Sequence, residues 1–421
     1  MGMKFIYRLL PCLLLLIVPS RSECCTSVII SGKNRPDGRP VMMKNRDSNH
    51  YYNHVAHFKG RRFRYVGLVN SDDDAGAVWG GTNEKGFCIM NTASYNLWEA
   101  SDGITRKEMD KEGEFMAAAL GVCADRKDFE KFLDTLSRPM RVETNIGIID
   151  AGGSAVYYEI GNLKWKSYDV NDPAVAPKGW LVRTNFSFCG RDADRAGVER
   201  YDTALSVMED AGDEVYTWGH TELLDRISRC YRHSVLGIDA RRDLPQMIAS
   251  GMFTGAFPNQ DFIPRKNTVS ALVFEGVKPG EHPLNTVMWA ALGYPACSVA
   301  FPVLVADRDR LPAYMVKDEG KKYCEANRYS RKMLFRYVFH YKEGAESAKY
   351  FDMENIVLGK DGAPSLIECV DAAQRRIDED FAALRSGMRD KTHTAGFFRK
   401  YEEHVSGYFS WQKLSFQRYP L

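Results

Sequence analysis

The sequence lacks a strong excess of charge of either sign. Its formal net charge is +2, and residues 1–24, which hold three basic residues and one acidic residue, account for that excess. A chain with nearly equal numbers of acidic and basic residues does not show the excess of positive charge that binding to nucleic acid or to an anionic membrane surface requires. We therefore expect no nucleic-acid partner and no membrane-surface partner.

The sequence also lacks the cysteine and histidine spacing of a metal site. Its ten cysteines are scattered, with no C-x-x-C pair, so a structural zinc site is not indicated. His50, His54 and His57 fall at helical spacing, but they follow a predicted strand end. We interpret these histidines as part of a loop or strand near a pocket, and we expect no metal ion and no cofactor.

Long apolar runs are scarce. The run Leu9–Val18 follows Lys4 and Arg8 and precedes Pro19 and small residues, which is the pattern of a secretory signal peptide. The run is too short to span a bilayer comfortably, and no second segment of spanning length follows. We predict that residues 1–24 are a signal peptide and that the mature chain is secreted or periplasmic, with no integral membrane segment. A lipid anchor at Cys24 is an alternative.

The remaining chain shows no internal repeat and no linker rich in Pro, Gly or Ser, so one large unit is expected. Strand-like segments are grouped apart from helix-like ones, which favours stacked antiparallel sheets covered by helices, an α+β fold. Beyond about residue 311 the sequence becomes charged and helix-like. We predict a core over 25–310 and a helical C-terminal extension over 311–421. Strands are expected at 26–31, 40–45, 65–69, 86–91, 145–150, 155–160, 180–184, 268–274 and 300–305, and helical segments at 113–124, 129–136, 215–233, 321–341 and 366–388.

One cysteine stands where the signal peptide should end. Cleavage after Cys24 would make Cys25 the new N-terminus, with Ser22 at the third position before the cut. Such a residue carries a thiol and an α-amine, whose ordinary pKa of about 7.7–8.0 leaves much of it neutral near neutral pH. The amine can then take the proton of the thiol, so one residue supplies both nucleophile and base.

Motifs downstream of Cys25 resemble those of the choloylglycine hydrolase and penicillin V acylase family, to which the acyl-CoA:6-aminopenicillanate acyltransferases are related. The Cys25-Thr26-Ser27 start is followed by Lys44-Asn45-Arg46-Asp47, where the family has Arg-Asn-x-Asp. Further similar segments are Asn83–Asn91, Arg183–Phe186 and Arg265–Val273. This resemblance implies an N-terminal-nucleophile (Ntn) hydrolase fold, a four-layer αββα sandwich.

The resemblance also implies roles for individual residues. Cys25 would be the nucleophile, Asp47 would hold its amine, and Asn91 and Asn185 would stabilise the oxyanion. Arg265 would fix the N-terminal residue electrostatically. Lys44 replaces the family Arg and cannot make the same fork of hydrogen bonds, so Arg46 is expected to share in substrate binding.

The implied activity is hydrolysis of a linear amide in a small N-acyl substrate through an acyl-thioester. Conjugated bile salts, N-acyl amino acids and acyl-side-chain β-lactams are the substrate types that the resemblance brings forward. Three alternatives stay open: an acyltransferase, a dipeptidase on the same fold, and a binding protein that lost activity. The sequence allows a homo-oligomer but does not determine the oligomeric state.

Overall fold

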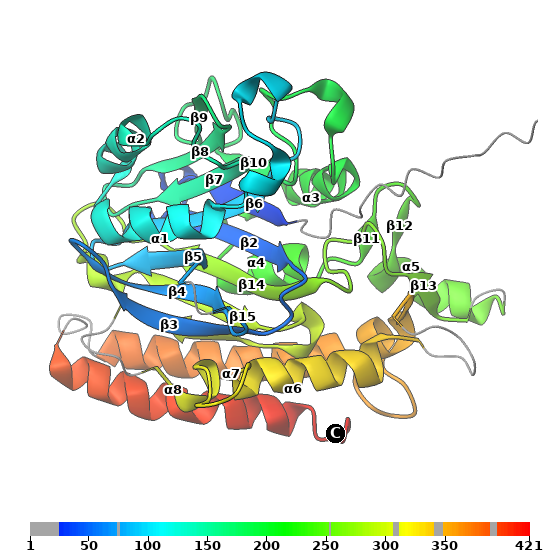
Figure 1. Cartoon of the computed structure of the whole chain (residues 1–421). Helices are drawn as coiled ribbons and strands as arrows, with labels where there is room; N and C mark the ends of the chain where they lie inside the picture. Colours follow the sequence, from blue (N-terminus) through cyan, green and yellow to red (C-terminus); the bar gives the residue numbers. More distant parts are fainter. Residues whose placement is uncertain (1–24, 74–75, 252–253, 306–310, 341–347, 388–393) are drawn as a thin grey trace, which may run out of the picture.

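The computed structural model describes residues 25–73, 76–251, 254–305, 311–340, 348–387 and 394–421. The predicted signal peptide, 1–24, lies outside the described residues. Two antiparallel sheets form the centre of the molecule (Figure 1). The helices lie outside them.

The first sheet has six strands in the order β10-β1-β2-β14-β15-β16. Its centre pairs β1 with β2, and β2 with the distant β14, which brings the beginning of the chain together with residues more than two hundred positions later. These central strands are buried along almost their whole length because both faces of the sheet are covered. The bounds are β1 Thr26–Ile30, β2 Val41–Asp47, β10 Trp180–Arg183, β14 Thr268–Glu275, β15 Val287–Leu292 and β16 Ala300–Val303.

The second sheet is a seven-stranded meander from β3 to β9 in sequence order. Consecutive strands pair antiparallel, so short turns suffice to connect most of them. A break in register between Gly67 and Val69 marks a bulge against β5. The bounds are β3 Asn53–Lys59, β4 Arg64–Asn70, β5 Val78–Asn83, β6 Cys88–Ala93, β7 Thr144–Ile149, β8 Ala155–Ile160 and β9 Trp165–Asp169.

The two sheets pack face to face through apolar side chains. A Cβ at Gly147 of β7 would meet Met90 of its own sheet and Ile29 and Met42 of the other sheet. Gly80 of β5 would likewise meet Leu272 of β14. These close approaches show that the space between the sheets is filled, as in other protein cores.

Helices cover the outer face of each sheet. The meander sheet is covered by α1 (Glu112–Val122) and α2 (Arg126–Thr135), and the six-stranded sheet by α3 (Val198–Asp210) and α4 (His220–Leu223). The order of layers is therefore helix, sheet, sheet, helix, which confirms the predicted αββα sandwich. Smaller elements beside the sandwich are α5 (Ala240–Ala249) and the strands β11 (Arg232–His233), β12 (Ile238–Asp239), β13 (Ala256–Pro258) and β17 (Tyr350–Asp352).

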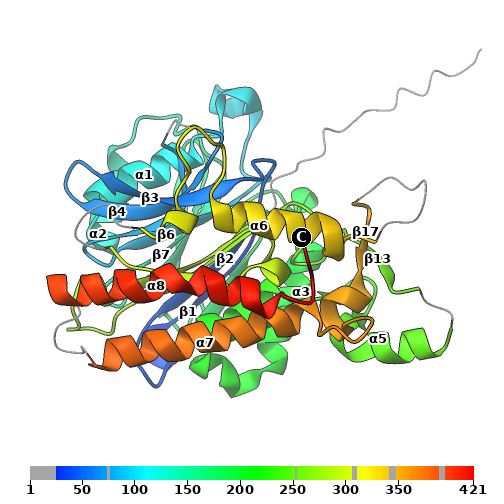
Figure 2. The same cartoon turned by 90° about the horizontal axis from the view of Figure 1, so that it is seen from below.

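The C-terminal part of the chain is helical and packs on the sandwich. It comprises α6 (Glu325–Met333), α7 (Leu366–Gly387) and α8 (Ala395–Ser415), and α7 and α8 lie side by side (Figure 2). Gln374 of α7 hydrogen-bonds both backbone groups of Ala300 in β16, and Tyr401 of α8 donates to the carbonyl of Pro302. These contacts fasten the extension to the edge of the six-stranded sheet.

One sequence prediction was wrong in part. The segment 215–233 was expected to be helical, but α4 is followed by a π-helical turn at Leu224–Ser228 and then by the short strand β11. The change occurs where Arg232 and His233 pair with β12. Helical periodicity does not report such a contact. Within the described ranges, no helix combines the length and the apolarity needed to cross a membrane.

Candidate active site

Cys25 lies directly before β1, at one end of the sandwich. Because Thr26 pairs with Asn45, Cys25 lies at the level of Arg46 and next to Asp47. Its side chain is buried. Burial raises the pKa of the Cys25 thiol, and the carboxylate of Asp47 acts in the same direction. The cations of Lys44 and Arg46 and the backbone N–H of Asp47 oppose this and lower the pKa.

A pocket of about 350 Å³ opens at Cys25. Strand β2 supplies Lys44, Arg46 and Asp47 to its wall, and β6 supplies Asn91 from the facing sheet. The pocket therefore lies where the ends of the two sheets meet. Five of the residues expected at the site are brought together here.

Lys44 is a buried cation at this pocket. Its Nζ donates to Oδ1 of Asn91 at 2.6 Å and to the carbonyl of Trp79 at 2.9 Å. The side-chain amide nitrogen of Asn91 in turn donates to Oγ1 of Thr144 at 3.3 Å. Lys44 thus links the two sheets and sets the orientation of Asn91. An arginine at this position would have a longer side chain and a planar guanidinium, and would orient Asn91 differently.

Arg46 lines the pocket but is anchored to a set of polar groups behind it. It donates to Oδ1 of Asn53 at 3.1 Å and to Oδ1 of Asn70 at 2.9 Å, and its guanidinium lies 4.7 Å from the ring centroid of Trp79. These contacts fix its planar group in one orientation. The positive charge is held close to Cys25 as a result.

Asp47 is held by two residues of the neighbouring segment of chain. Its Oδ2 accepts from Nε of Arg265 at 2.7 Å, and its Oδ1 accepts from Oγ1 of Thr268 at 2.6 Å. Thr268 and Asp47 are paired across β14 and β2, so the carboxylate is fixed from the adjacent strand. Arg265 acts on the site through Asp47 and also lines a neighbouring hollow of about 600 Å³.

Asn185 is buried and is tied to Cys25 by Arg200, a residue that the sequence analysis missed. Nη1 of Arg200 donates to the carbonyl of Cys25 at 2.8 Å and to Oγ1 of Thr26 at 3.0 Å, while Nη2 donates to Oδ1 of Asn185 at 2.9 Å. The amide nitrogen of Asn185 donates to the carbonyl of Ala93 at 2.7 Å. Arg200 follows a run of charged residues that is typical of a solvated surface, so its burial gave no sequence signal.

Two carboxylates on the wall of the pocket were also missed. Glu143 forms an ion pair of 3.1 Å with Arg106 and accepts hydrogen bonds from the backbone of Leu97 and Trp98. Glu112, at the start of α1, accepts from the backbone N–H of Glu143 at 2.9 Å. Both glutamates are buried. The pocket beside Cys25 is therefore lined by charges of both signs.

The three histidines lie apart from this pocket. His54 and His57 are in β3, and His50 precedes it and pairs with Asp72. Among the described residues, no group of three or more His, Cys, Asp or Glu side chains is arranged to hold a metal ion. All eight cysteines of the described ranges are free thiols.

No protein-family model matches the sequence, and the search of curated proteins finds no match. The structure is similar to a Caenorhabditis elegans N-acylethanolamine-hydrolyzing acid amidase ortholog, with a TM-score of 0.38 and 16% identity over 59% of this chain and 92% of that chain. It is also similar to a mutant of conjugated bile acid hydrolase from Clostridium perfringens (TM-score 0.38, 11% identity, 64% and 89% covered). A third similar structure is penicillin V acylase from Agrobacterium tumefaciens (TM-score 0.33, 12% identity, 67% and 86% covered).

Proposed function

We propose that the chain is a secreted cysteine Ntn hydrolase that cleaves a linear amide bond of a small N-acyl substrate. The observation that carries this proposal is the position of Cys25, whose thiol lines a pocket together with Lys44, Arg46 and Asp47. Removal of residues 1–24 would place a free α-amine on the same residue. Nucleophile, base and stabilising cations would then lie within one pocket.

The proposed reaction proceeds through two additions to a carbonyl. The neutral α-amine of Cys25 takes the proton of the thiol, and the thiolate attacks the amide carbon of the substrate. The carbonyl oxygen gains the negative charge, near the cation of Lys44 and the amides of Asn91 and Asn185. The C–N bond then breaks, and the leaving amine takes the proton from the α-ammonium group. Water, deprotonated by the amine, hydrolyses the thioester to a carboxylic acid and regenerates the thiol.

Asp47 has a supporting role in this proposal. Because Arg265 and Thr268 hold its carboxylate, Asp47 can face the α-ammonium group that forms in each half-reaction. A fixed carboxylate stabilises that cation and keeps the amine directed at the substrate. Lys44 and Arg46 act in the opposite sense on the thiol, because positive charge favours the thiolate.

A dipeptidase is a second candidate, and one observation favours it. The carboxylates of Glu112 and Glu143 line the same pocket as Cys25, and a carboxylate-lined wall suits the free amine of a peptide better than an apolar acyl chain. The two functions are separated by comparing hydrolysis of free dipeptides with hydrolysis of the same dipeptides carrying an N-acyl group. Faster hydrolysis of the free dipeptides supports the dipeptidase. Acyl transfer to an added amine would instead support the acyltransferase alternative.

The first experiment is the intact mass and N-terminal sequence of the exported protein. A chain that begins at Cys25 supports the proposal, and an N-acyl substrate panel then identifies the substrate. Cys25→Ala serves as the control that keeps the fold but has no thiol. A mature protein that retains Cys24 would have no α-amine at Cys25, and the catalytic proposal would be wrong.

A further inference from the structure

A second pocket lies at the opposite end of the sandwich from Cys25. Its volume is about 770 Å³, and its wall includes Val41 and Glu275, which are the outer ends of the paired strands β2 and β14. Asp47 and Thr268 stand at the other ends of these strands. Since a strand rises about 3.3 Å per residue, roughly 20 Å separates the two pockets.

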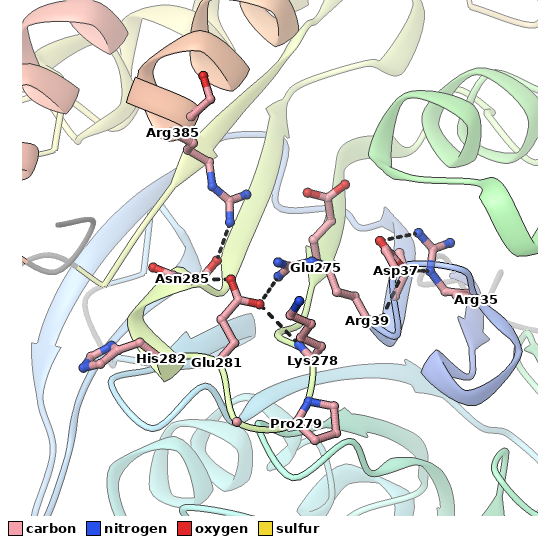
Figure 3. Close-up of a pocket in the computed structure, with 13 residues that line it drawn as sticks. Arg35, Asp37, Arg39, Glu275, Lys278, Pro279, Glu281, His282, Asn285 and Arg385 are labelled. Carbon is pink, nitrogen blue, oxygen red and sulfur yellow. Dashed lines mark hydrogen bonds and ion pairs between the residues drawn. The ribbon is translucent and has the colours of Figure 1, made fainter. Parts of the chain in front are cut away.

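Three segments far apart in the sequence supply charged side chains to this pocket. Arg35, Asp37 and Arg39 come from the turn before β2, Lys278 and Glu281 from the loop after β14, and Arg385 from the end of α7 (Figure 3). Figure 3 shows Arg385 reaching from the helix toward the loop that carries Glu281. The pocket therefore joins the core to the C-terminal extension.

Each carboxylate of the pocket already has a cationic partner. Asp37 pairs with Arg35 at 3.2 Å, and Glu281 pairs with Arg39 at 2.6 Å. The carboxylate of Glu275 lies 2.8 Å from Nδ1 of His220 and also accepts a hydrogen bond from Nε1 of Trp289 at 3.1 Å. The carboxylates that line the pocket are therefore all engaged by cations of the protein itself.

Two cations remain once these pairs are formed. Within the described ranges, neither Lys278 nor Arg385 takes part in an ion pair, and the guanidinium of Arg385 makes one hydrogen bond, to the carbonyl of Asn285 at 3.3 Å. Burial lowers the pKa of Arg385, although the charge of Glu275 partly opposes this. A partly buried guanidinium with one carbonyl partner is stabilised by an anion at its free edge.

We infer that this pocket binds a small dianion whose oxygens bridge Arg385 and Lys278, either a phosphoryl group or a dicarboxylate. The guanidinium offers a planar fork that fits two oxygens, and the lysine adds a flexible point charge from the facing loop. Arg39, fixed by Glu281 and by the carbonyl of Gly276, forms the adjacent wall. This site is separate from the proposed amidase site and does not depend on it.

The test is titration calorimetry of the full mature chain with inorganic phosphate and, separately, with succinate, at constant ionic strength set with chloride. We expect saturable binding of at least one of them at millimolar or lower concentration. Binding of phosphate alone identifies a phosphoryl ligand, and binding of succinate alone identifies a dicarboxylate. Arg385→Gln and Lys278→Gln should each weaken binding about tenfold, because each removes one charge-assisted contact.

Lys127→Gln, which removes an exposed lysine from α2 on the far face of the meander sheet, is the matched control and should bind as the wild type does. Lys278 is exposed, so its variant is expected to fold even if Arg385→Gln does not. Absence of saturable binding with both anions would overturn the inference. Equal affinity in the wild type and Lys278→Gln would overturn it too, since the lysine would then not contact the ligand.

Discussion

Arg200 donates a buried hydrogen bond of 2.9 Å to Oδ1 of Asn185, close to the candidate nucleophile. The same guanidinium holds the carbonyl of Cys25. It therefore fixes the residue that is proposed to attack and one that is proposed to stabilise the resulting charge. A Cβ at Gly197 would overlap the guanidinium of Arg200, so the glycine at the start of α3 is needed for this placement.

Arg200→Met is expected to lower kcat by about tenfold to a hundredfold, because Cys25 and Asn185 lose their common anchor. KM should change less, since Arg200 does not line the pocket. Arg200→Lys should recover only part of the rate, because an ammonium cannot replace the fork. Steady-state kinetics on the amide substrate, with the exposed Arg242→Met as control, measure this. An equal loss in the control would contradict a specific role.

Cys25→Ala should abolish turnover, and Cys25→Ser should reduce it by at least about a thousandfold. The reason is that the thiolate is a far better nucleophile than a hydroxyl with the same neighbours. Thermal unfolding should remain close to that of the wild type in both variants. Wild-type turnover by Cys25→Ala would show that another residue carries the chemistry.

Replacement of Lys44 tests the electrostatics of the thiol. Lys44 lowers the pKa of Cys25 against the effect of burial, so Lys44→Met should raise that pKa further, and Lys44→Arg should keep it near the wild-type value. The measurement is the rate of thiol alkylation against pH, with Cys25→Ala to subtract the other cysteines. An unchanged profile in Lys44→Met would mean that the ammonium group has no influence on the thiol.

His220 is expected to make the stability of the protein depend on pH. Although burial disfavours its charged form, Glu275 and Asp378 raise the pKa of His220 from 6.5 to about 10. Because the folded-state pKa is raised, protonated His220 contributes fully to the free energy of unfolding below about pH 6.5. This contribution is lost as the pH rises toward 10, by up to about 1.4 kcal/mol per pH unit. Urea unfolding of wild type and His220→Asn between about pH 7 and pH 9 measures this. The difference in free energy of unfolding between the two should shrink as the pH rises, and a constant difference would refute it.

Much of the sandwich could be predicted because its strands and helices carry local signals. The predicted strand 155–160 coincides with β8, and the predicted helix 113–124 differs from α1 by one or two residues at each end. The segment 215–233 could not be predicted in the same way. Its helical pattern ends where β11 pairs with β12. That pairing depends on the contact between the two segments, so the periodicity of one segment alone does not show it.

For the candidate site, the sequence determined the residues near the nucleophile in the chain. Cys25 directly precedes β1, and Lys44, Arg46 and Asp47 lie on β2, so a hairpin and its register suffice to bring them together. The two carboxylates of the pocket wall, Glu112 and Glu143, and the guanidinium of Arg200 reach the site only through tertiary packing. Each comes from a different element and looks like an ordinary exposed charge until the sheets close around it.

The sequence by itself thus determined that stacked sheets are covered by helices, because periodicity and turn residues act over a few neighbours, and it placed Cys25 directly before the first strand. Only the tertiary structure decided which charges became buried together. Packing between distant segments puts the guanidinium of Arg200 against Asn185, and it places Arg385 and Lys278 on the wall of one pocket. Burial of Arg200 then matters for its chemistry, because it removes water from the charge.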